Sequence, residues 1–458
     1  MTKAVVGSDD QWGTRTTFFL ALSAAAIGLG NIWRFSYLTG EYGGGAFVIS
    51  YVACLLLVAV PLLIAEVVLG AQGGPGPVAA IHRAGDASGL SRGWGLVGVL
   101  ASVCGLLILS CLIVVAGWCM AYAGFMHSGV FSSAVPVEVG QHFAGYLSDP
   151  APQMYWQSLF LLMAAGTLVL GIRRGLALLV WLVVPLAVAL LAFLIKFNFD
   201  NGNIEAAGDF LFTTRMADFS PRTVLMALAH ALFTLAIGVG TGISYGAYAA
   251  GDIPPGRSVI AVALFDTLFG LLAGIAIFPV VFANNLEPAV GPGLLFISLP
   301  YAFGNLQQGE LAGTVFFLLM TVAALGSAVA IKEPIVAGLI RHLRLSRFTA
   351  CLVVGAVVWL MAQAVVVSLG PGNAFPSLGG GNLLGLFDIL TAGVLLPVVA
   401  FLLSLLVGWR LSPELLREGL ARESDRFFSL WYFLLRYIAP PAIALLLLMS
   451  ALGESGIV

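Results

Sequence analysis

The feature that most constrains this chain is a succession of apolar stretches, each about twenty residues long, separated by short polar segments. A helix of about 20 apolar residues spans the hydrocarbon core of a bilayer, whereas the strands of a membrane β-barrel are about half that length and alternate in polarity. Only 9% of the residues are charged, against about 25% in soluble domains. The sequence therefore predicts an all-α polytopic membrane protein. A net charge of −2 provides no basic surface for nucleic acid.

Turn residues divide the apolar stretches into eleven predicted spans. Their approximate limits are 13–37, 44–70, 93–126, 154–171, 176–198, 221–250, 257–283, 310–342, 346–369, 383–410 and 428–452. Lysine and arginine favour cytoplasmic loops, and the loops 127–153, 284–309 and 370–382 contain neither residue. We therefore expect a plasma-membrane (inner-membrane) protein with a cytoplasmic N-terminus and, after eleven spans, an external C-terminus.

Small residues interrupt the first and sixth predicted spans, near 24–30 and 238–242. Interrupted helices five spans apart are typical of inverted-repeat transporters, which bind their substrate at the breaks. Glycine-rich stretches also occur where helices pack closely, so the glycines alone leave both interpretations open. Asn31, Thr234 and Asp266 lie within spans and form an oxygen-rich set that suits a hard cation.

Longer motifs make the sequence resemble the neurotransmitter:sodium symporter family, especially its bacterial eleven-span amino-acid transporters. In chain order the motifs are WGTRTTFFLALSAAAIGLGNIWRF at 12–35, GGGAF at 43–47, VVAGW at 114–118, FTLAIGVGTGISYGAY at 233–248, DTLFGLLAGIAIFP at 266–279, SAVAIKEP at 327–334 and RYIAPPAI at 436–443. The resemblance implies one transporter domain, 1–458, with a five-plus-five inverted repeat and broken helices 1 and 6. Repeat one would cover about 13–198, repeat two about 221–410, and an extra helix about 428–452.

The resemblance also implies sodium as the coupling ion. The matching first-site residues are Ala26, Asn31, Thr234 and Asp266, and the matching second-site residues are Ala24, Ile27, Ala323 and Ser327. An acid at position 266 resembles the chloride-independent members, so we expect no chloride requirement; a structural pair of Asp266 with Lys332 or a hydroxyl is the alternative. Gly326 replaces one side-chain ligand of the second site, so we expect that site to be weak, completed by water, or absent.

The substrate pocket implied by the same matching is almost entirely apolar. Its residues are Ala25, Ala26, Leu29, Gly30, Ile108, Leu112, Phe233, Thr234, Ala236, Val239, Ser327 and Ile331. Leu112 stands where the family has a tyrosine that donates to the substrate carboxylate, a bond worth about 1.5–3 kcal/mol. Val239 replaces a phenylalanine. A hydrophobic amino acid fits such a pocket, and a substrate that lacks an α-carboxylate is the alternative.

The resemblance places gates on both sides of this pocket. The outer-gate residues are Arg34, Asp388 and the aromatic lid Phe233; the inner-gate residues are Asp9, Arg341, Trp12 and Tyr248. The charges of Asp9 and Arg341 are exchanged relative to the family, which keeps an ion pair possible. Lys332 comes five residues after Ser327, roughly 140° around a helix, so we expect it to face away from the site and to pair with an acid.

Together these features predict a sodium-coupled secondary active symporter that works by alternating access. A second hypothesis, motivated by departures at Leu112, His230, Gly326 and Lys332, is a proton-coupled or sodium-independent carrier of a substrate other than an α-amino acid. His230 is expected to be neutral and buried, or else to carry a pH-dependent charge. An enzyme would need a nucleophile–base pair and a channel a continuous polar lining, and neither pattern is present. The expected partners are a small molecule and the bilayer; no oligomeric state is predicted.

Overall fold

Helices account for all regular structure in the residues that the computed structural model describes, which are 11–214, 218–249, 253–286, 293–370 and 381–452. Each of the eleven predicted spans overlaps one or more helices of the structure. The label η denotes a π-helical stretch or, at η4, a 3-10 turn. The elements are α1, η2 and α2 (Arg15–Ala26, Gly30–Arg34, Phe35–Glu41); α3, η3 and α4 (Gly45–Cys54, Leu55–Ala59, Val60–Gly73); α6 (Gly95–His127); α8 (Pro150–Val169); η5 and α9 (Ile172–Leu176, Ala177–Asn201); α11 and α12 (Pro221–Thr234, Thr241–Ala247); α13 (Pro255–Ala283); α15 (Gly309–Leu343); α16 (Arg347–Leu369); α17, η8, α18 and η9 (Leu383–Asp388, Ile389–Leu395, Leu396–Leu405, Leu406–Arg410); and α20, η10 and α21 (Asp425–Phe433, Leu434–Ile438, Ala439–Ala451).

Shorter helices connect these long elements. They are α5 (Pro77–Ala87), η4 (Arg92–Trp94), α7 (Pro136–Ser148), α10 (Ile204–Phe212), η7 with α14 (Leu294–Ser298, Leu299–Gly304) and α19 (Pro413–Gly419). Helix starts follow local sequence signals: the hydroxyls of Ser220 and Ser346 accept the backbone N–H groups of Thr223 and Thr349. Such caps satisfy donors that the first helical turn leaves unpaired.

By length and composition, eight helices in the described part of the chain can cross a membrane, and the bent pair Arg15–Ala26 and Gly30–Glu41 makes nine. The two remaining predicted spans correspond to α8, which has 20 residues, and to the α11–α12 pair. The latter is interrupted at residues 235–240. Helices α11 and α12 have 14 and 7 residues, so neither is long enough to cross the bilayer alone.

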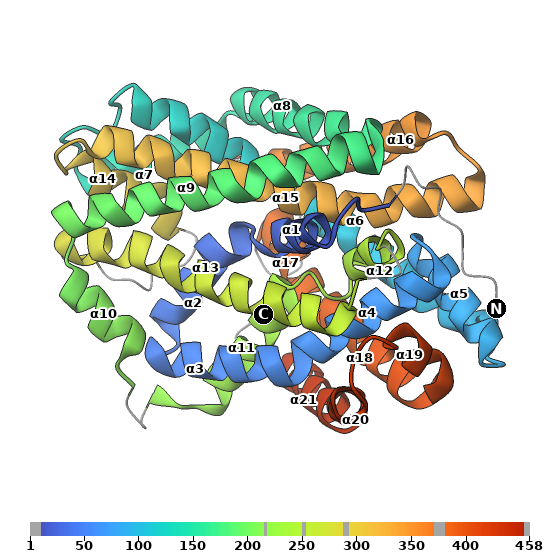
Figure 1. Cartoon of the computed structure of the whole chain (residues 1–458). Coiled ribbons are helices and arrows are strands. Elements are labelled where there is room, and N and C mark those ends of the chain that lie inside the picture. Colours follow the sequence, from blue (N-terminus) through green and yellow to red (C-terminus); the bar gives the residue numbers. More distant parts are fainter. Residues whose placement is uncertain (1–10, 215–217, 250–252, 287–292, 371–380, 453–458) are drawn as a thin grey trace.

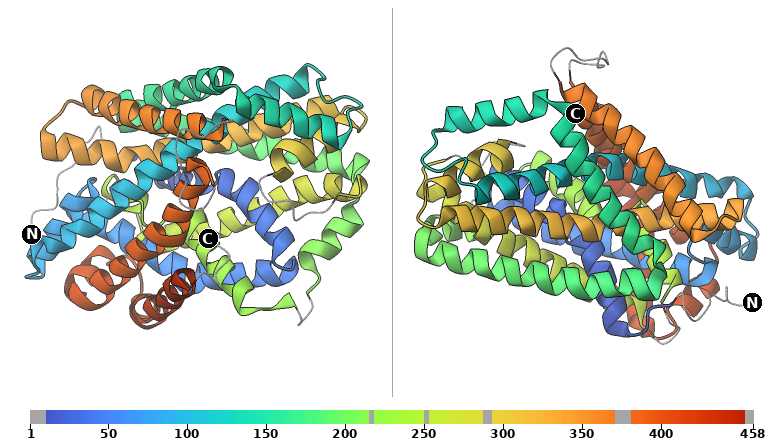
Figure 2. Two further views of the ribbon diagram at one scale, coloured as in Figure 1. Left: turned by 180° about the vertical axis from the view of Figure 1, so that it is seen from behind. Right: turned by 90° about the horizontal axis from the view of Figure 1, so that it is seen from above.

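The two interrupted helices lie in the middle of the molecule (Figure 1). Helix α1 packs against α15, α9, α13 and α12, and α12 packs along α4. Figure 2 shows that α8 and α16 lie on one flank, whereas α20 and α21 lie on the opposite one. The breaks are therefore surrounded by protein, where irregular backbone is tolerated in a membrane.

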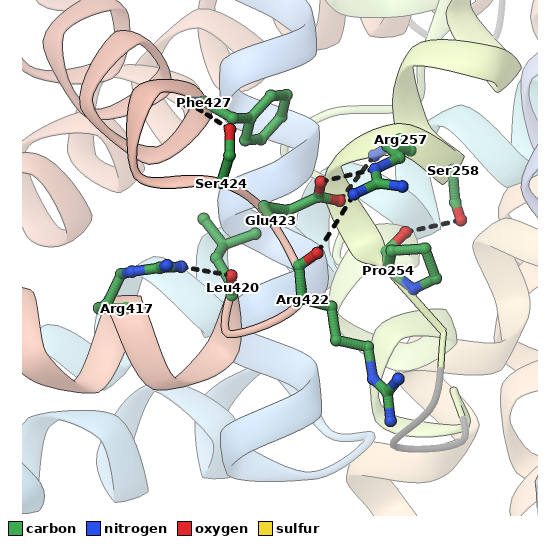
Figure 3. A network of polar contacts seen from close by, with 9 residues as sticks. All are labelled: Pro254, Arg257, Ser258, Arg417, Leu420, Arg422, Glu423, Ser424 and Phe427. Carbon is green, nitrogen blue, oxygen red and sulfur yellow. Dashed lines mark hydrogen bonds and ion pairs between the residues drawn. The ribbon is translucent and has the colours of Figure 1, made fainter.

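The loop before α20 is attached to the start of α13 by a buried carboxylate (Figure 3). Glu423 accepts hydrogen bonds from the backbone N–H and from Nε of Arg257, both at 3.0 Å, and its side chain is 1% exposed. Arg257 lies in the first turn of α13, so this carboxylate also faces the positive end of the helix dipole. A Cβ on Gly256 would lie 3.0 Å from the carboxylate and 2.5 Å from the Phe427 ring, so glycine permits the close approach.

We expect Glu423→Ala to lower the free energy of unfolding by about 1–3 kcal/mol, because two donors lose their charged acceptor. Thermal unfolding of the purified protein in detergent measures the change. Asp425→Ala is the matched control, since its pair with Arg417 is exposed, with the aspartate side chain 91% accessible, and such pairs contribute about 0–1 kcal/mol. Equal melting temperatures for the two variants would contradict the assignment.

Candidate ion and substrate site

Both predicted helix interruptions are present in the structure. Helix α1 ends at Ala26 and the chain continues from Gly30 with a bend of 54°. The second interruption covers residues 235–240, where Gly238 and Gly240 both have φ of +82°. Glycine adopts this conformation without steric cost. Ala236 also has a positive φ, +50°, so the unwound stretch begins a few residues before the glycine-rich sequence that predicted it.

A buried carboxylate compensates for the second interruption. Glu66 on α4 is 0% exposed. One of its oxygens accepts the N–H of Gly238 at 2.8 Å and the other accepts the N–H of Gly242 at 3.1 Å. Each buried N–H left unpaired would cost about 1–3 kcal/mol. This role of Glu66 was not predicted from the sequence, although a charge within an apolar span is itself a signal of function.

Polar side chains from η2, α3, α11 and α13 meet at Asp266. Asn31 donates from Nδ2 to Oδ1 at 2.7 Å, and Tyr51 donates from Oη to Oδ2 at 2.8 Å. The Thr234 hydroxyl lies 3.1 and 3.2 Å from the two carboxylate oxygens. All four residues are at most 3% exposed. The result is one buried carboxylate in contact with the Asn31 amide nitrogen and two hydroxyls, and the Asn31 amide oxygen completes this oxygen-rich cluster at 3.3 Å from the Thr234 hydroxyl. No cluster of three or more His, Cys, Asp or Glu residues that could hold a metal occurs in the described ranges.

This set contains the three side chains predicted for the first ion site and one residue that was missed, Tyr51. Tyr51 precedes Asp266 by 215 positions, so nothing in the local sequence around either residue indicates their contact. The fourth predicted ligand, the carbonyl of Ala26, belongs to the last residue of α1. Ala26 and Thr234 also line the adjacent cavity, so the residues predicted for the first ion site and the cavity lining overlap.

Lys332 does not approach Asp266. Its Nζ has no hydrogen-bond partner within the described residues, and it lies 3.4 Å from the position of a Cβ on Gly355 of α16. The expectation that Lys332 faces away from the site is confirmed, because Lys332 is absent from the cavity lining. The expectation that it pairs with an acid is wrong: its neighbour Glu333 directs both oxygens to Arg347.

A cavity of about 60 Å³ lies between the two interruptions. All twelve residues predicted for the substrate pocket line it, and Gly28 and Leu396 complete the lining. Apart from the hydroxyls of Thr234 and Ser327, the side chains are aliphatic or aromatic. The structure thus brings together residues of α1, η2, α6, α11, α15 and the interruption in the sixth predicted span.

The residues predicted for a second ion site lie where α1 and α15 touch. The Ser327 hydroxyl donates to the carbonyl of Ala25 at 3.2 Å. A Cβ on Gly326 would lie 2.6 Å from the carbonyl oxygen of Ala24. Glycine at 326 therefore allows the helices to come this close, and a larger side chain would require them to separate. Ile27 directly follows α1 as its C-cap residue, and Ala323 is fully buried in α15.

An ion pair and an aromatic ring close one side of the cavity. Arg34 contacts Asp388 at 3.0 Å, and the guanidinium carbon lies 4.8 Å from the centre of the Phe233 ring. A carbon of that ring is 3.2 Å from the Cβ position of Gly30, so Phe233 covers the first interruption. A larger cavity of about 410 Å³ lies beyond it, and its lining includes Arg34, Asp388 and Phe233.

On the other side, Trp12 joins the start of the chain to α12. Its indole N–H donates to the carbonyl of Tyr245 at 3.0 Å, and its backbone N–H donates to the carbonyl of Tyr248 at 2.9 Å. Trp12 and Tyr248, both assigned to the inner gate from the sequence, are therefore in contact. Asp9 lies outside the described residues, and Arg341 is exposed.

A second polar network closes the same side. Tyr248 donates from Oη to Glu333 at 2.6 Å, and Arg347 binds both oxygens of Glu333 at 2.6 and 3.2 Å. Arg347 also donates from Nε to the carbonyl of Leu168 at 2.7 Å. Since Glu333 is 0% exposed, this buried network ties α12 to α15, α16 and the end of α8. This network was not predicted from the sequence.

His230 is 1% exposed, and its ring packs against the rings of Phe35, Phe47 and Tyr51 at centroid distances of 5.8, 6.2 and 5.2 Å. Neither ring nitrogen has a hydrogen-bond partner among the described residues. Tyr51 is thus the shared neighbour of His230 and Asp266.

Comparison with known proteins agrees with this geometry. The model of the sodium:neurotransmitter symporter family matches residues 9–139 and 148–455. The sodium-dependent transporter YhdH of Bacillus subtilis is 31% identical over 96% of this chain and 97% of its own length. A sodium-dependent transporter of Methanocaldococcus jannaschii is 29% identical over 95% and 88% of the two chains. The crystal structure of MhsT in complex with L-phenylalanine superposes with a TM-score of 0.87 at 33% identity, covering 96% of this chain and 99% of that one.

Proposed function

Because this chain belongs to the sodium:neurotransmitter symporter family, we propose that it imports a small, largely hydrophobic amino acid or similar zwitterion together with sodium. The family consists of membrane transporters, not enzymes, and the relatives named above are sodium-dependent. The observation that carries the proposal is the sharing of Thr234 between the oxygen cluster at Asp266 and the apolar cavity. An ion and a substrate bound there would be neighbours.

The donor set at Asp266 fits a monovalent hard cation. Carboxylate, amide and hydroxyl oxygens are ligands of hard cations, and a calcium site would gather several carboxylates. Here one buried carboxylate supplies a single compensating charge. We assign Ala26, Asn31, Thr234 and Asp266 to this ion and expect chloride to be unnecessary. The tight contact at Gly326 favours one sodium ion per substrate over two.

The cavity lining supports an apolar substrate. MhsT was solved with L-phenylalanine, and the cavity of the present chain is mainly aliphatic, with Val239, Ile108 and Ile331 among its residues. We place the α-carboxylate at the backbone of Leu29 and Gly30, next to the ion, because backbone N–H groups at a helix start favour anions.

One sodium ion is sufficient to drive accumulation. Movement of one charge down 100 mV contributes about 2.3 kcal/mol, and a tenfold concentration gradient adds about 1.4 kcal/mol. The sum of about 3.7 kcal/mol supports an accumulation of several hundredfold. The outer pair of Arg34 and Asp388, with the aspartate 54% exposed, is worth about 0–1 kcal/mol, so it can open in every cycle.

The arrangement of charge supports a cytoplasmic N-terminus and an external C-terminus. Helices α5 and α19 and the turn between α15 and α16 lie at the same end of the molecule in Figure 1. Arg83, Arg344 and Arg417 belong to these three segments, so arginines gather at this end of the molecule. We assign that end to the cytoplasm of a plasma (inner) membrane.

Uptake of radiolabelled amino acids into liposomes that contain the purified protein tests the proposal. We expect accumulation of apolar amino acids with an inward sodium gradient, none with choline, and no change when gluconate replaces chloride. Uptake that needs no sodium and follows a proton gradient would instead select a proton-coupled or sodium-independent carrier of another substrate.

The proposed carboxylate position can be probed at Leu112. We expect Leu112→Tyr to increase affinity for an α-amino acid about tenfold or more, because the added hydroxyl donates a hydrogen bond to a charged group. Competition binding with the amino acid that is taken up best measures the change. Leu112→Phe adds the ring without the hydroxyl, and an equal effect of both variants would argue against a carboxylate at this place.

We also assign the network of Tyr248, Glu333 and Arg347 to the inner gate. Arg347→Gln should loosen the cytoplasmic side, because the buried carboxylate of Glu333 then loses the guanidinium that binds both of its oxygens. Amide hydrogen exchange of α12 should become at least tenfold faster, whereas α18 serves as an internal reference. Tyr248→Phe, which removes one hydrogen bond, should have a smaller effect, and unchanged exchange in both variants would exclude this gate.

A further inference from the structure

Arg436 lies within the last long helix, Asp425–Ala451, and is surrounded by aromatic rings. Its guanidinium carbon is 4.5 Å from the ring centre of Trp409, 5.5 Å from that of Tyr437 and 5.6 Å from that of Tyr432. Nη1 donates to the Tyr432 hydroxyl at 3.2 Å, and the Trp409 indole donates to the Arg436 carbonyl at 3.0 Å. The side chain is therefore held in place by groups that carry no charge.

No carboxylate pairs with Arg436 in the part of the chain that the structure describes. Its Nε is buried and has no hydrogen-bond partner there. The acids that precede it are engaged elsewhere: Glu423 binds Arg257, and Asp425 binds Arg417. Removing a charge from water is costly unless the charge is paired. A partly buried guanidinium without an anion therefore indicates that an anion from outside the described residues binds here.

The position of Arg436 relative to the membrane suggests where its anion comes from. Trp409 and Arg410 are the last two residues of the span Leu383–Arg410, so the cluster lies level with the end of that span. Tryptophan and tyrosine gather at the level of the lipid headgroups. Trp409, Phe433 and Tyr437 are each 50% exposed, so the surface is open to lipid.

Apolar and aromatic groups extend from Arg436 in both directions along this helix. Toward the loop, Phe428 stacks on Tyr432 at a centroid distance of 5.7 Å and an angle of 8°. Toward the bilayer centre, the exposed Leu448 follows Tyr437 by eleven residues, which is about three helical turns and so the same face. A headgroup at Arg436 would thus be continuous with an apolar surface for an acyl chain.

We propose that Arg436, together with Trp409 and Tyr437, binds the phosphate of an anionic phospholipid on the arginine-rich side of the membrane. The guanidinium supplies a planar set of donors that matches phosphate oxygens, and the rings provide the interfacial walls. An anionic lipid is favoured over a zwitterionic one because no carboxylate among the described residues compensates the charge of Arg436.

Native mass spectrometry of the full-length protein, delipidated and then titrated with defined lipids, tests this site. We expect one phosphatidylglycerol molecule to bind at least tenfold more tightly than phosphatidylcholine. Millimolar inorganic phosphate should not displace it, because the acyl chains contribute to binding. Displacement by phosphate would show a site for the free anion and overturn the lipid assignment.

Substitutions of Arg436 test whether this residue binds the lipid. Arg436→Gln should lower affinity for phosphatidylglycerol at least tenfold, whereas Arg436→Lys, which keeps the charge without the planar fork, should have an intermediate effect. Arg92→Gln is the matched control, since Arg92 is an exposed arginine in another arginine-rich loop. If Arg436→Gln fails to fold, Arg436→Lys and Trp409→Phe, each expected to weaken binding several-fold, serve in its place.

Melting temperatures in nanodiscs give an independent readout. Phosphatidylglycerol discs should stabilise the wild-type protein relative to phosphatidylcholine discs, and this difference should shrink selectively in Arg436→Gln or, if that variant does not fold, in Arg436→Lys. Equal affinity for the two lipids, equal loss in Arg92→Gln, or a protein dimer that covers this surface without lipid would each overturn the proposal.

Discussion

Replacement of Asp266 with asparagine should weaken sodium binding by roughly 100-fold or more. The substitution keeps the shape of the side chain but removes the only charge in the oxygen cluster formed with Asn31, Tyr51 and Thr234. Two unit charges 4 Å apart interact with about 4 kcal/mol at an effective dielectric constant of 20, which sets the scale of the loss. The midpoint of a sodium titration of substrate binding, measured on the purified protein, reports it.

Tyr51→Phe is the control for this experiment. It removes one hydrogen bond to the same carboxylate but leaves the charge, so its sodium midpoint should shift less than tenfold. Asp266→Ala should be at least as severe as Asp266→Asn. If the sodium midpoint of all three variants equals that of the wild-type protein, the ion does not bind at Asp266.

Glu66→Ala should lower the free energy of unfolding by about 2–6 kcal/mol, because it leaves the N–H groups of Gly238 and Gly242 buried without an acceptor. The unwound residues 235–240 would then lose their fixed conformation, and substrate binding should fall with stability. Thermal unfolding and equilibrium binding, measured on the same preparation, report the two effects.

Glu66→Gln keeps one carbonyl oxygen and should therefore lie between the wild-type protein and the alanine variant. Glu310→Ala serves as the control for loss of an acid, since Glu310 is exposed and contacts Ser132. A Glu66→Ala protein with normal melting temperature and normal affinity would show that the interruption holds its shape without this carboxylate.

Much of this fold could be predicted because hydropathy and glycine content are local signals. The spans follow from apolar stretches of bilayer length, and the glycines at 238 and 240 mark backbone that must take positive φ. The predicted interruption was displaced by a few residues because Ala236, which carries no such signal, also adopts a positive φ.

The cavity residues followed from long motifs that resemble a known family, and the structure places all twelve around one space. The contacts that were missed join distant parts of the chain. Tyr51 meets Asp266, and Glu66 meets Gly238 across 172 positions. No pattern of spacing or composition indicates such pairs, because helix packing alone decides which polar side chain reaches which partner.

The inner network shows the same limit. Arg347 could be expected on the cytoplasmic side as one of many arginines, but its choice of Glu333 depends on how α16 turns back along α15. Lys332, the residue before Glu333, was expected to find an acid and does not. Adjacent positions on a helix face different neighbours, and the sequence does not identify those neighbours.

The central claim is that ion and substrate bind side by side at the two helix interruptions, with Thr234 common to both. Equilibrium binding of the best-transported amino acid to the purified protein, over a range of sodium concentrations, tests it most directly. We predict that sodium raises substrate affinity at least tenfold and that substrate raises sodium affinity by the same factor, since coupling between two ligands is reciprocal. Equal substrate affinity in sodium and in choline would contradict the claim.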